Sequence, residues 1–181
     1  MAVAGPVEIE FRRGTADDSL CVGVLAMQVF LDTYATEGIR PDLAREALSV
    51  YTPEKFAERL SHRSTQFLLA ERMGHLVAFA EVVHDGEPPD PSISRGAELV
   101  RLYVHPHFKR RGLGRALLAQ VETMAKSKSA ECLWLTAWVG NAPALAFYAA
   151  LGYTDIGATT YSFQGNSYEN RIFTRTLAGA P

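Results

Sequence analysis

The segment from Lys109 to Leu118, KRRGLGRALL, constrains the fold of this chain more than any other stretch. It places three basic residues and two glycines between an apolar stretch, AELVRLYV, and a helical pattern. The helix is predicted from one apolar stripe, formed by Leu113, Leu117, Val121 and Met124. The preceding stretch is apolar at both parities, which is typical of a buried central strand. The segment therefore predicts a strand, a tight turn and a helix, as in a mixed α/β domain.

The turn itself has the properties of an anion-binding site. The first N–H groups of a helix lack partners, and residues without Cβ atoms let a phosphate approach the main chain. Arginines beside it add charge-assisted hydrogen bonds. The spacing is neither the Gly-Lys-Ser/Thr of a Walker loop nor the GxGxxG of the dinucleotide fold. We therefore expect a phosphate or pyrophosphate, with a merely solvated basic turn as the alternative.

The rest of the chain is predicted to form one domain, residues 1–181, without repeats or linkers. A strand is expected at 7–11, and Thr15 with Asp18 is a capping signal for a first helix. The longest connection without predicted structure, Asp85 to Gly96, is the expected functional loop. Helices and strands alternate elsewhere: helices over 42–48, 53–60 and 142–151, and strands over 64–72, 75–83, 97–104 and 132–138, with two more around Gln164 to Asn166.

Composition narrows the class of protein. No apolar stretch is long enough for a signal peptide or a membrane span, so a cytoplasmic protein without a membrane partner is expected. The net charge of −2 argues against nucleic acid as a partner. Cys21 and Cys132 lack a CxxC or histidine context, so we expect no metal and two buried thiols.

Two motifs together identify a family resemblance. Lys109-Arg110-Arg111-Gly112-Leu113-Gly114 resembles the acetyl-CoA loop of the GCN5-related N-acetyltransferase (GNAT) superfamily, Gln/Arg-x-x-Gly-x-Gly/Ala, with Lys109 departing from its first position. The stretch NAPALAFYAALGY resembles the second family signature at Asn141, Ala144, Tyr148, Gly152 and Tyr153. The resemblance implies the GNAT fold, an α/β (α+β mixed) structure whose mostly antiparallel twisted sheet has a splayed strand pair and flanking helices. A closer likeness to polyamine acetyltransferases associated with sporulation regulators is suggested by LDTYATEG and the final hairpin.

The resemblance also implies how acetyl-CoA, the co-substrate, is bound. Main-chain groups of Leu102, Tyr103 and Val104 should pair with pantetheine and polarise the thioester carbonyl. Asn141 should bond a pantetheine amide, although it would also serve as a helix N-cap. The pyrophosphate should lie on the loop residues Lys109, Arg110, Arg111, Gly112, Leu113, Gly114 and Arg115.

The expected reaction is direct attack of a primary amine on the thioester in a ternary complex, which requires a base and an acid. Glu98, fourteen positions before Gly112, stands where the histone-acetylating branch carries its general base. Strand alternation places it on one face with Val100, Leu102 and Val104. Glu71 and Glu81, expected to be at least half-exposed, are the other candidates through water. Tyr148 is the expected acid, as a phenol matched to an alkyl thiol.

An acetyl-cysteine route through Cys132 is disfavoured, because this residue begins its strand and should lie far from the thioester. His105 and His107, beside a proline in a turn, are expected to be structural.

The amine is expected to be a small molecule or polyamine. Asp32, Glu37, Glu81 and Asp85 are candidates to surround such a cation. The alternatives are acetylation of a protein N-terminus or lysine, and a non-catalytic acetyl-CoA-binding regulatory module, which retention of Tyr148 disfavours. The oligomeric state is left open, with a homodimer among the options.

Overall fold

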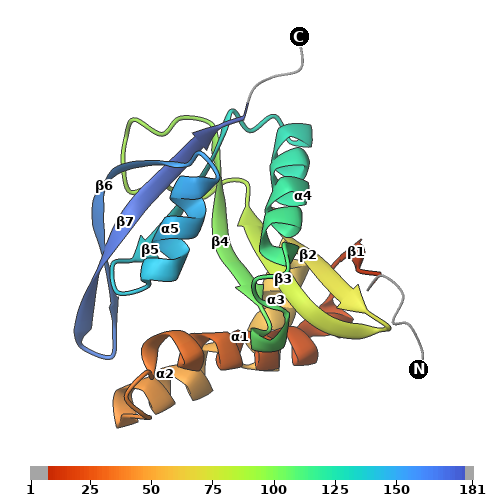
Figure 1. The fold of residues 1–181 in the computed structure, drawn as a ribbon, viewed down its shortest axis with the longest axis vertical. Coiled ribbons are helices and arrows are strands. Elements are labelled where there is room, and N and C mark those ends of the chain that lie inside the picture. The colour runs from red at the N-terminus through yellow and green to blue at the C-terminus, as the bar shows by residue number, and fades with distance from the viewer. Residues whose placement is uncertain (1–7, 178–181) are drawn as a thin grey trace.

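The structure is a computed structural model that describes residues 8–177, and its centre is one seven-stranded sheet (Figure 1). The strand order is β1-β2-β3-β4-β5-β7-β6, and only β4 and β5 are parallel neighbours. The mixed fold predicted from the sequence is thus confirmed. The strands are β1 Glu10–Arg13, β2 Thr65–Arg72, β3 His75–Val83, β4 Gly96–Val104, β5 Cys132–Trp138, β6 Thr154–Phe163 and β7 Asn166–Thr176.

Helices cover both faces of the sheet (Figure 1). One face packs against the first three helices through buried aromatic and aliphatic residues such as Phe67, Leu69 and Phe79. The other face packs against α4 and α5 through residues such as Leu99, Leu117 and Leu135. The helices are α1 Ser19–Tyr34, α2 Pro41–Val50, α3 Pro53–Ser61, α4 Leu113–Ser127 and α5 Ala142–Ala150, with short 3₁₀ turns at Ala16–Asp18 and Pro106–Phe108.

Several local predictions can be checked directly. Thr15 and Asp18 form the predicted capping box, where the Thr15 N–H donates to the Asp18 carboxylate over 2.8 Å. The first strand begins later than predicted, at Glu10, and Val7 lies outside the described residues. The expectation of two buried thiols is wrong, because Cys21 faces solvent on α1 and Cys132 is only half-buried.

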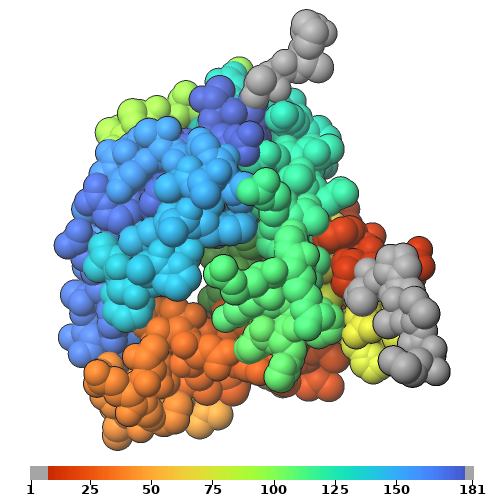
Figure 2. All heavy atoms as spheres, viewed as in Figure 1, coloured from red at the N-terminus to blue at the C-terminus, as the bar shows by residue number. Residues whose placement is uncertain are grey.

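The parallel pair β4 and β5 separates soon after it forms. Their register joins Gly96 to Cys132, Ala97 to Leu133 and Glu98 to Trp134, and ends there. Beyond Glu98, β4 pairs only with β3, and β5 pairs only with β7. The predicted splayed strand pair is therefore present. In Figure 2 the molecular surface is hollowed between α5, the turn before α4 and the end of α1.

A β-bulge in β4 changes which residues share a face. Val82 pairs with Leu99 and Glu81 pairs with Arg101, so Val100 is an extra residue in the ladder. Leu102 consequently packs on the α4 face together with Leu99. The predicted alternation is therefore wrong: Glu98 lies on the opposite face from Leu102 and Val104, together with Arg101.

Candidate active site

The turn before α4 has the backbone of an anion-binding loop. Arg110 and Gly112 both adopt positive φ angles, 60° and 79°, and Gly112 is the N-cap of α4. The first intrahelical bond runs from the Ala116 N–H to the Gly112 carbonyl, 3.0 Å. The N–H groups of the helix's first turn are therefore free to bind a ligand.

The side chains of this loop are unneutralised. Within residues 8–177, no carboxylate lies within ion-pair distance of Lys109, Arg110, Arg111 or Arg115, and all four are exposed. Arg111 lies over the Phe108 ring, 5.6 Å from its centroid. The loop thus presents four cations beside a positive helix end, as an anionic ligand requires.

The two glycines of the loop differ in what a side chain would meet. At Gly112 the left-handed conformation disfavours any side chain, although an added Cβ would meet no atom within 4 Å. At Gly114 the conformation is ordinary and an added Cβ would lie 3.5 Å from Phe147. Neither glycine is required by packing alone, and the open space over Gly112 is where a phosphate would lie.

The residues of the second motif lie on α5. Asn141 is the helix N-cap, and its side-chain oxygen accepts from the Ala144 N–H over 3.2 Å. Tyr148 is buried in the α4 and α5 face, where its ring contacts Phe147, Tyr153 and Phe173. Burial raises the pKa of Tyr148, and the neighbouring Tyr103 phenol raises it further. Tyr148 therefore carries its proton at neutral pH.

The edge of β4 facing the gap supplies unpaired backbone. Leu102, Tyr103 and Val104 pair on one side with Ala80, Phe79 and Ala78 of β3. On the other side no strand pairs with them, because β5 has diverged. Their main-chain groups are thus free to bond a ligand lying in the gap as an added strand.

Glu98 is half-buried at the closed end of the gap. The loop between β3 and β4 lies over it, since a Cβ added at Gly86 would be 3.0 Å from its Oε2. Trp134 of β5 is its partner across the parallel pair. Burial raises the pKa of Glu98, the Glu81 charge raises it further, and Arg59 and Arg101 oppose that rise. The carboxylate is thereby a stronger base than an exposed one.

The two other predicted bases are committed to ion pairs. Glu81 is completely buried rather than half-exposed, and its carboxylate binds Arg59 of α3 and Arg101 of β4. Glu71 accepts from Arg12 over 2.5 Å at the β1 end of the sheet. Of the three predicted bases, Glu98 alone has no ion pair among the described residues.

The remaining candidate residues, Cys132 and His105, have structural contacts of their own. Cys132 begins β5 at the closed end of the gap, and its thiol lies 3.8 Å from the Ser94 carbonyl. His105 caps the turn before α4 by accepting from the His107 N–H over 3.3 Å. Within the described residues, no group of three His, Cys, Asp or Glu side chains could hold a metal.

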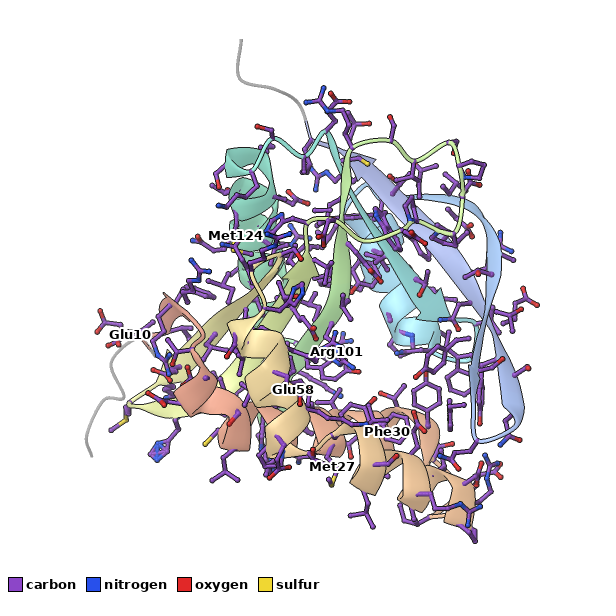
Figure 3. The ribbon with its side chains drawn as sticks, turned by 180° about the vertical axis from the view of Figure 1, so that it is seen from behind. Glu10, Met27, Phe30, Glu58, Arg101 and Met124 are labelled. Carbon is purple, nitrogen blue, oxygen red and sulfur yellow. The ribbon has the colours of Figure 1, made fainter. Side chains whose placement is uncertain are left out.

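Aromatic residues that sequence reasoning missed line the face opposite α5. Tyr34 of α1 stacks on Trp138 of β5, with centroids 5.0 Å apart, and contacts Tyr168 of β7. The Arg101 guanidinium carbon lies over the Tyr51 and Phe56 rings, 5.8 and 5.5 Å from their centroids. In Figure 3, Arg101 lies between β4 and the helices of this face, which include α1 with Phe30. These residues come from distant parts of the sequence, and no local pattern marks them.

Glu46 of α2 was also missed. It is only 6% exposed, and its one hydrogen-bond donor is the neutral Gln164 amide at 3.4 Å. Within residues 8–177 no basic side chain lies within ion-pair distance of it. Burial raises the pKa of Tyr161, and the Glu46 charge raises it further. Glu46 thus lies where α2 meets the turn between β6 and β7, at one side of the aromatic face.

Comparison with known proteins decides the family. Residues 33–153, more than half of the chain, match the sequence pattern of the acetyltransferase (GNAT) family. The chain belongs to this acetyltransferase family. The match includes both motifs and β4, the strand before the first motif, with Glu98. The enzyme class predicted from the motifs is therefore confirmed.

Individual relatives of this acetyltransferase agree on the activity class. An uncharacterized N-acetyltransferase of Lactobacillus delbrueckii subsp. lactis is 25% identical over 72% of this chain and 75% of that protein. The ribosomal protein bS18 alanine N-acetyltransferase of Escherichia coli is 32% identical over 58% of this chain and 65% of that enzyme. These relatives do not support the closer likeness to polyamine acetyltransferases.

Solved structures share the fold. The PaiA N-acetyltransferase of Thermoplasma acidophilum, in complex with coenzyme A, has a TM-score of 0.76 and 22% identity. The comparison covers 93% of this chain and 99% of that one. No helix within residues 8–177 of this acetyltransferase is long and apolar enough to cross a membrane.

Within this acetyltransferase, the two candidate proton-transfer residues lie on opposite faces of the sheet. Tyr148 belongs to the α4 and α5 face, whereas Glu98 belongs to the face that carries Arg101. The gap between β4 and β5 is the route that joins the two faces.

Proposed function

We propose that the chain is a single-domain, acetyl-CoA-dependent N-acetyltransferase that transfers the acetyl group to a primary amine by direct attack in a ternary complex. The observation that supports this best is the β4–β5 gap, because it connects the basic loop and Tyr148 with Glu98 and the aromatic face. A cofactor entering from one side can therefore meet an acceptor entering from the other.

The cofactor would use the groups that the structure leaves unpaired. The pyrophosphate would bind the free N–H groups at Gly112 to Gly114 and the exposed cations of Lys109, Arg110, Arg111 and Arg115. The pantetheine arm would pair with the free edge of β4 at Leu102, Tyr103 and Val104. The side-chain amide nitrogen of Asn141 would bond the same arm, since its oxygen already caps α5. The coenzyme A complex of the fold relative is consistent with this use of the loop.

The residues would move protons as follows. An alkyl amine with a pKa of ~10.4 must lose a proton before it attacks, and Glu98 would accept that proton directly or through one water. The amine nitrogen then bonds to the thioester carbon, and a main-chain N–H of β4 stabilises the resulting oxyanion. When the carbon–sulfur bond breaks, Tyr148 would protonate the departing thiolate. The nitrogen would release its second proton, which restores the Tyr148 phenol through water, and Glu98 would return its proton to solvent. The same dry surroundings that hold the proton on Tyr148 also disfavour a free thiolate.

For the acceptor, Glu46 supports a small aliphatic amine that carries a second positive charge, a class that includes polyamines. Glu46 is only 6% exposed, and none of the described residues pairs a cation with its carboxylate, so a second ammonium group of the acceptor would meet an unneutralised negative charge. The Tyr161 ring, whose pKa responds to the Glu46 charge, would add cation–π attraction for an ammonium group. Of the acids expected around the substrate, Glu81 is excluded by its two arginines.

A protein N-terminus is the second candidate acceptor. It is favoured by one observation, the 32% identity to the ribosomal protein alanine N-acetyltransferase of Escherichia coli. An N-terminal amine belongs to a polypeptide that must extend out of the β4–β5 gap, whereas a small diamine would bind there whole. The two candidates therefore differ in whether a second charge on the acceptor matters.

The test measures acetyl-CoA-dependent thiol release with monoamines, diamines of increasing length, and peptides beginning with alanine. We expect the highest kcat/KM for a diamine, and Glu46→Gln should lower it by about tenfold while leaving a monoamine of equal length unchanged. Preference for the alanine peptide, with no effect of Glu46→Gln, would transfer the assignment to N-terminal acetylation. If none of the acceptors in the panel supported thiol release from acetyl-CoA, the proposed reaction would be contradicted.

A further inference from the structure

Glu81 is the most deeply buried charged side chain of the described residues. Its exposed fraction is zero, and both carboxylate oxygens are occupied by arginines. Oε1 accepts from the Arg59 Nε over 2.6 Å, and Oε2 accepts from an Arg101 terminal nitrogen. Arg101 is itself nearly buried, with 12% of its side chain exposed, whereas Arg59 is 40% exposed. The group therefore carries a net charge of about one positive unit, counted from its formal charges.

This ion network lies beside Glu98 because of the bulge at Val100. The extra residue turns Arg101 onto the face that carries Glu98, where regular alternation would have placed it on the other face. Arg101 stands three positions after Glu98 on that face, with a long side chain and five donors. Without another acceptor, an Arg–carboxylate pair between Arg101 and Glu98 would be the expected outcome.

We propose that Glu81 is a positioning residue that holds the Arg101 guanidinium away from Glu98 and so keeps the Glu98 carboxylate free to accept the proton of the amine. The proposal rests on the proposed function, in which Glu98 is the general base. Glu81 itself touches neither cofactor nor acceptor in this scheme. Its own carboxylate cannot act as the base while two arginines occupy it.

The charges facing Glu98 can be assigned to every neighbouring element. β3 contributes Glu81, β4 contributes Arg101 and α3 contributes Arg59. The covering loop places the uncharged Gly86 against Glu98, with Asp85 and Glu87 on either side of it in the chain, and β5 contributes the uncharged Trp134. Burial and Glu81 raise the pKa of Glu98, whereas Arg59 and Arg101 lower it. Removing Glu81 or Arg59 should therefore move that pKa in opposite directions.

The experiment follows the Glu98 carboxyl by NMR in protein labelled with ¹³C at the glutamate side-chain carboxyl, with Glu98→Gln assigning the resonance. Glu81→Gln should lower the pKa of Glu98 by about one pH unit or more, because Arg101 is released toward it. Arg59→Gln should raise it. The acidic limb of the kcat/KM profile should move in the same two directions, and kcat of Glu81→Gln should fall by about tenfold or more.

A matched control is Arg171→Gln, which breaks an exposed pair with Asp155 on the β6–β7 hairpin and should leave both readouts unchanged. If Glu81→Gln does not fold, Arg59→Gln still tests the proposal, because its side chain is partly exposed. A Glu98 pKa that is the same in both variants, or that moves in one direction in both, overturns the positioning role. Failure of the proposed function has a different signature: Glu98→Gln stays fully active while the opposite NMR shifts persist.

Discussion

The two faces of the sheet around the β4–β5 gap are built on different principles. On the α4 and α5 face, the core residues are apolar or aromatic, and the charges stand at the exposed loop before α4 and in the partly exposed Arg175–Glu122 pair. On the opposite face, a carboxylate and a guanidinium are buried in the core beside half-buried Glu98. One face thus offers main chain and surface charge, and the other offers buried charge and aromatic rings.

This difference corresponds to what each face would have to recognise. A nucleotide cofactor is constant, so free N–H groups and exposed cations are sufficient to bind it, and these need few specific side chains. An amine must be selected and deprotonated, which requires side chains with altered proton affinity in a restricted space. Substitutions on the two faces should therefore affect different kinetic constants.

The largest effect is expected on the Glu98 face. Glu98→Gln should lower kcat by about 10²-fold or more, the usual range for a positioned general base. Acetyl-CoA affinity should remain unchanged, because no cofactor group contacts this carboxylate in the proposed scheme. Raising the pH should recover part of the loss, since more amine then arrives deprotonated. Steady-state kinetics from pH 6 to 10, with calorimetry for acetyl-CoA, measures both quantities.

The decisive comparison is the shape of the two pH profiles. If the variant retains activity within a few-fold at neutral pH and the same ascending limb, Glu98 is structural. The base would then be a water, because Glu71 and Glu81 are held in ion pairs.

A smaller kinetic effect is expected from the α5 face. Tyr148→Phe should lower kcat by up to about 10²-fold, because it removes only the proton donated to the departing thiolate. The ring packing against Tyr153 and Phe173 is retained, so neither stability nor acetyl-CoA affinity should change much. Tyr153→Phe is the matched control, since that phenol on the same face donates to Glu122 over 2.9 Å. Equal turnover of Tyr148→Phe and wild type would assign the acid role to water.

The next effect is on cofactor binding alone. Gly112→Ala should weaken coenzyme A binding by about tenfold, because its Cβ occupies the space of the phosphate and strains a residue at φ 79°. Gly74→Ala provides the strain control, since Gly74 has a φ of 74° and equally open surroundings in the β2–β3 turn. Calorimetry that finds unchanged affinity in a folded Gly112→Ala protein would remove the pyrophosphate from this loop.

The same contrast explains which parts of the site could be predicted from the sequence. The loop at Gly112 and the Asn141 cap are local, so their residue types and spacing were sufficient. The ion network is not local, because Arg59 and Arg101 lie 22 and 20 positions from Glu81. In the stretch HLVAFAEVV, Glu81 looks like the polar half of an alternating strand, and only the packing of α3 shows that it is buried. The bulge at Val100 has no sequence signal and reversed the predicted face of Glu98.

The smallest predicted effect concerns stability and tests whether Glu98 is held in an unfavourable state. Its pKa is raised in the folded protein, chiefly by burial, so the folded state prefers the protonated carboxyl. Stability from this preference is complete below the unfolded pKa of about 4.3 and is lost as the pH rises through the folded pKa. Glu98→Gln, which is always neutral, should therefore raise Tm by a few degrees at pH 8 and leave it unchanged at pH 4. Glu131→Gln, at an exposed ion pair with Arg95, should show no such pH-dependent gain. A Glu98→Gln protein that is less stable than wild type at pH 8 would mean that the carboxylate stabilises the fold, and that its burial beside the gap serves structure instead of proton transfer.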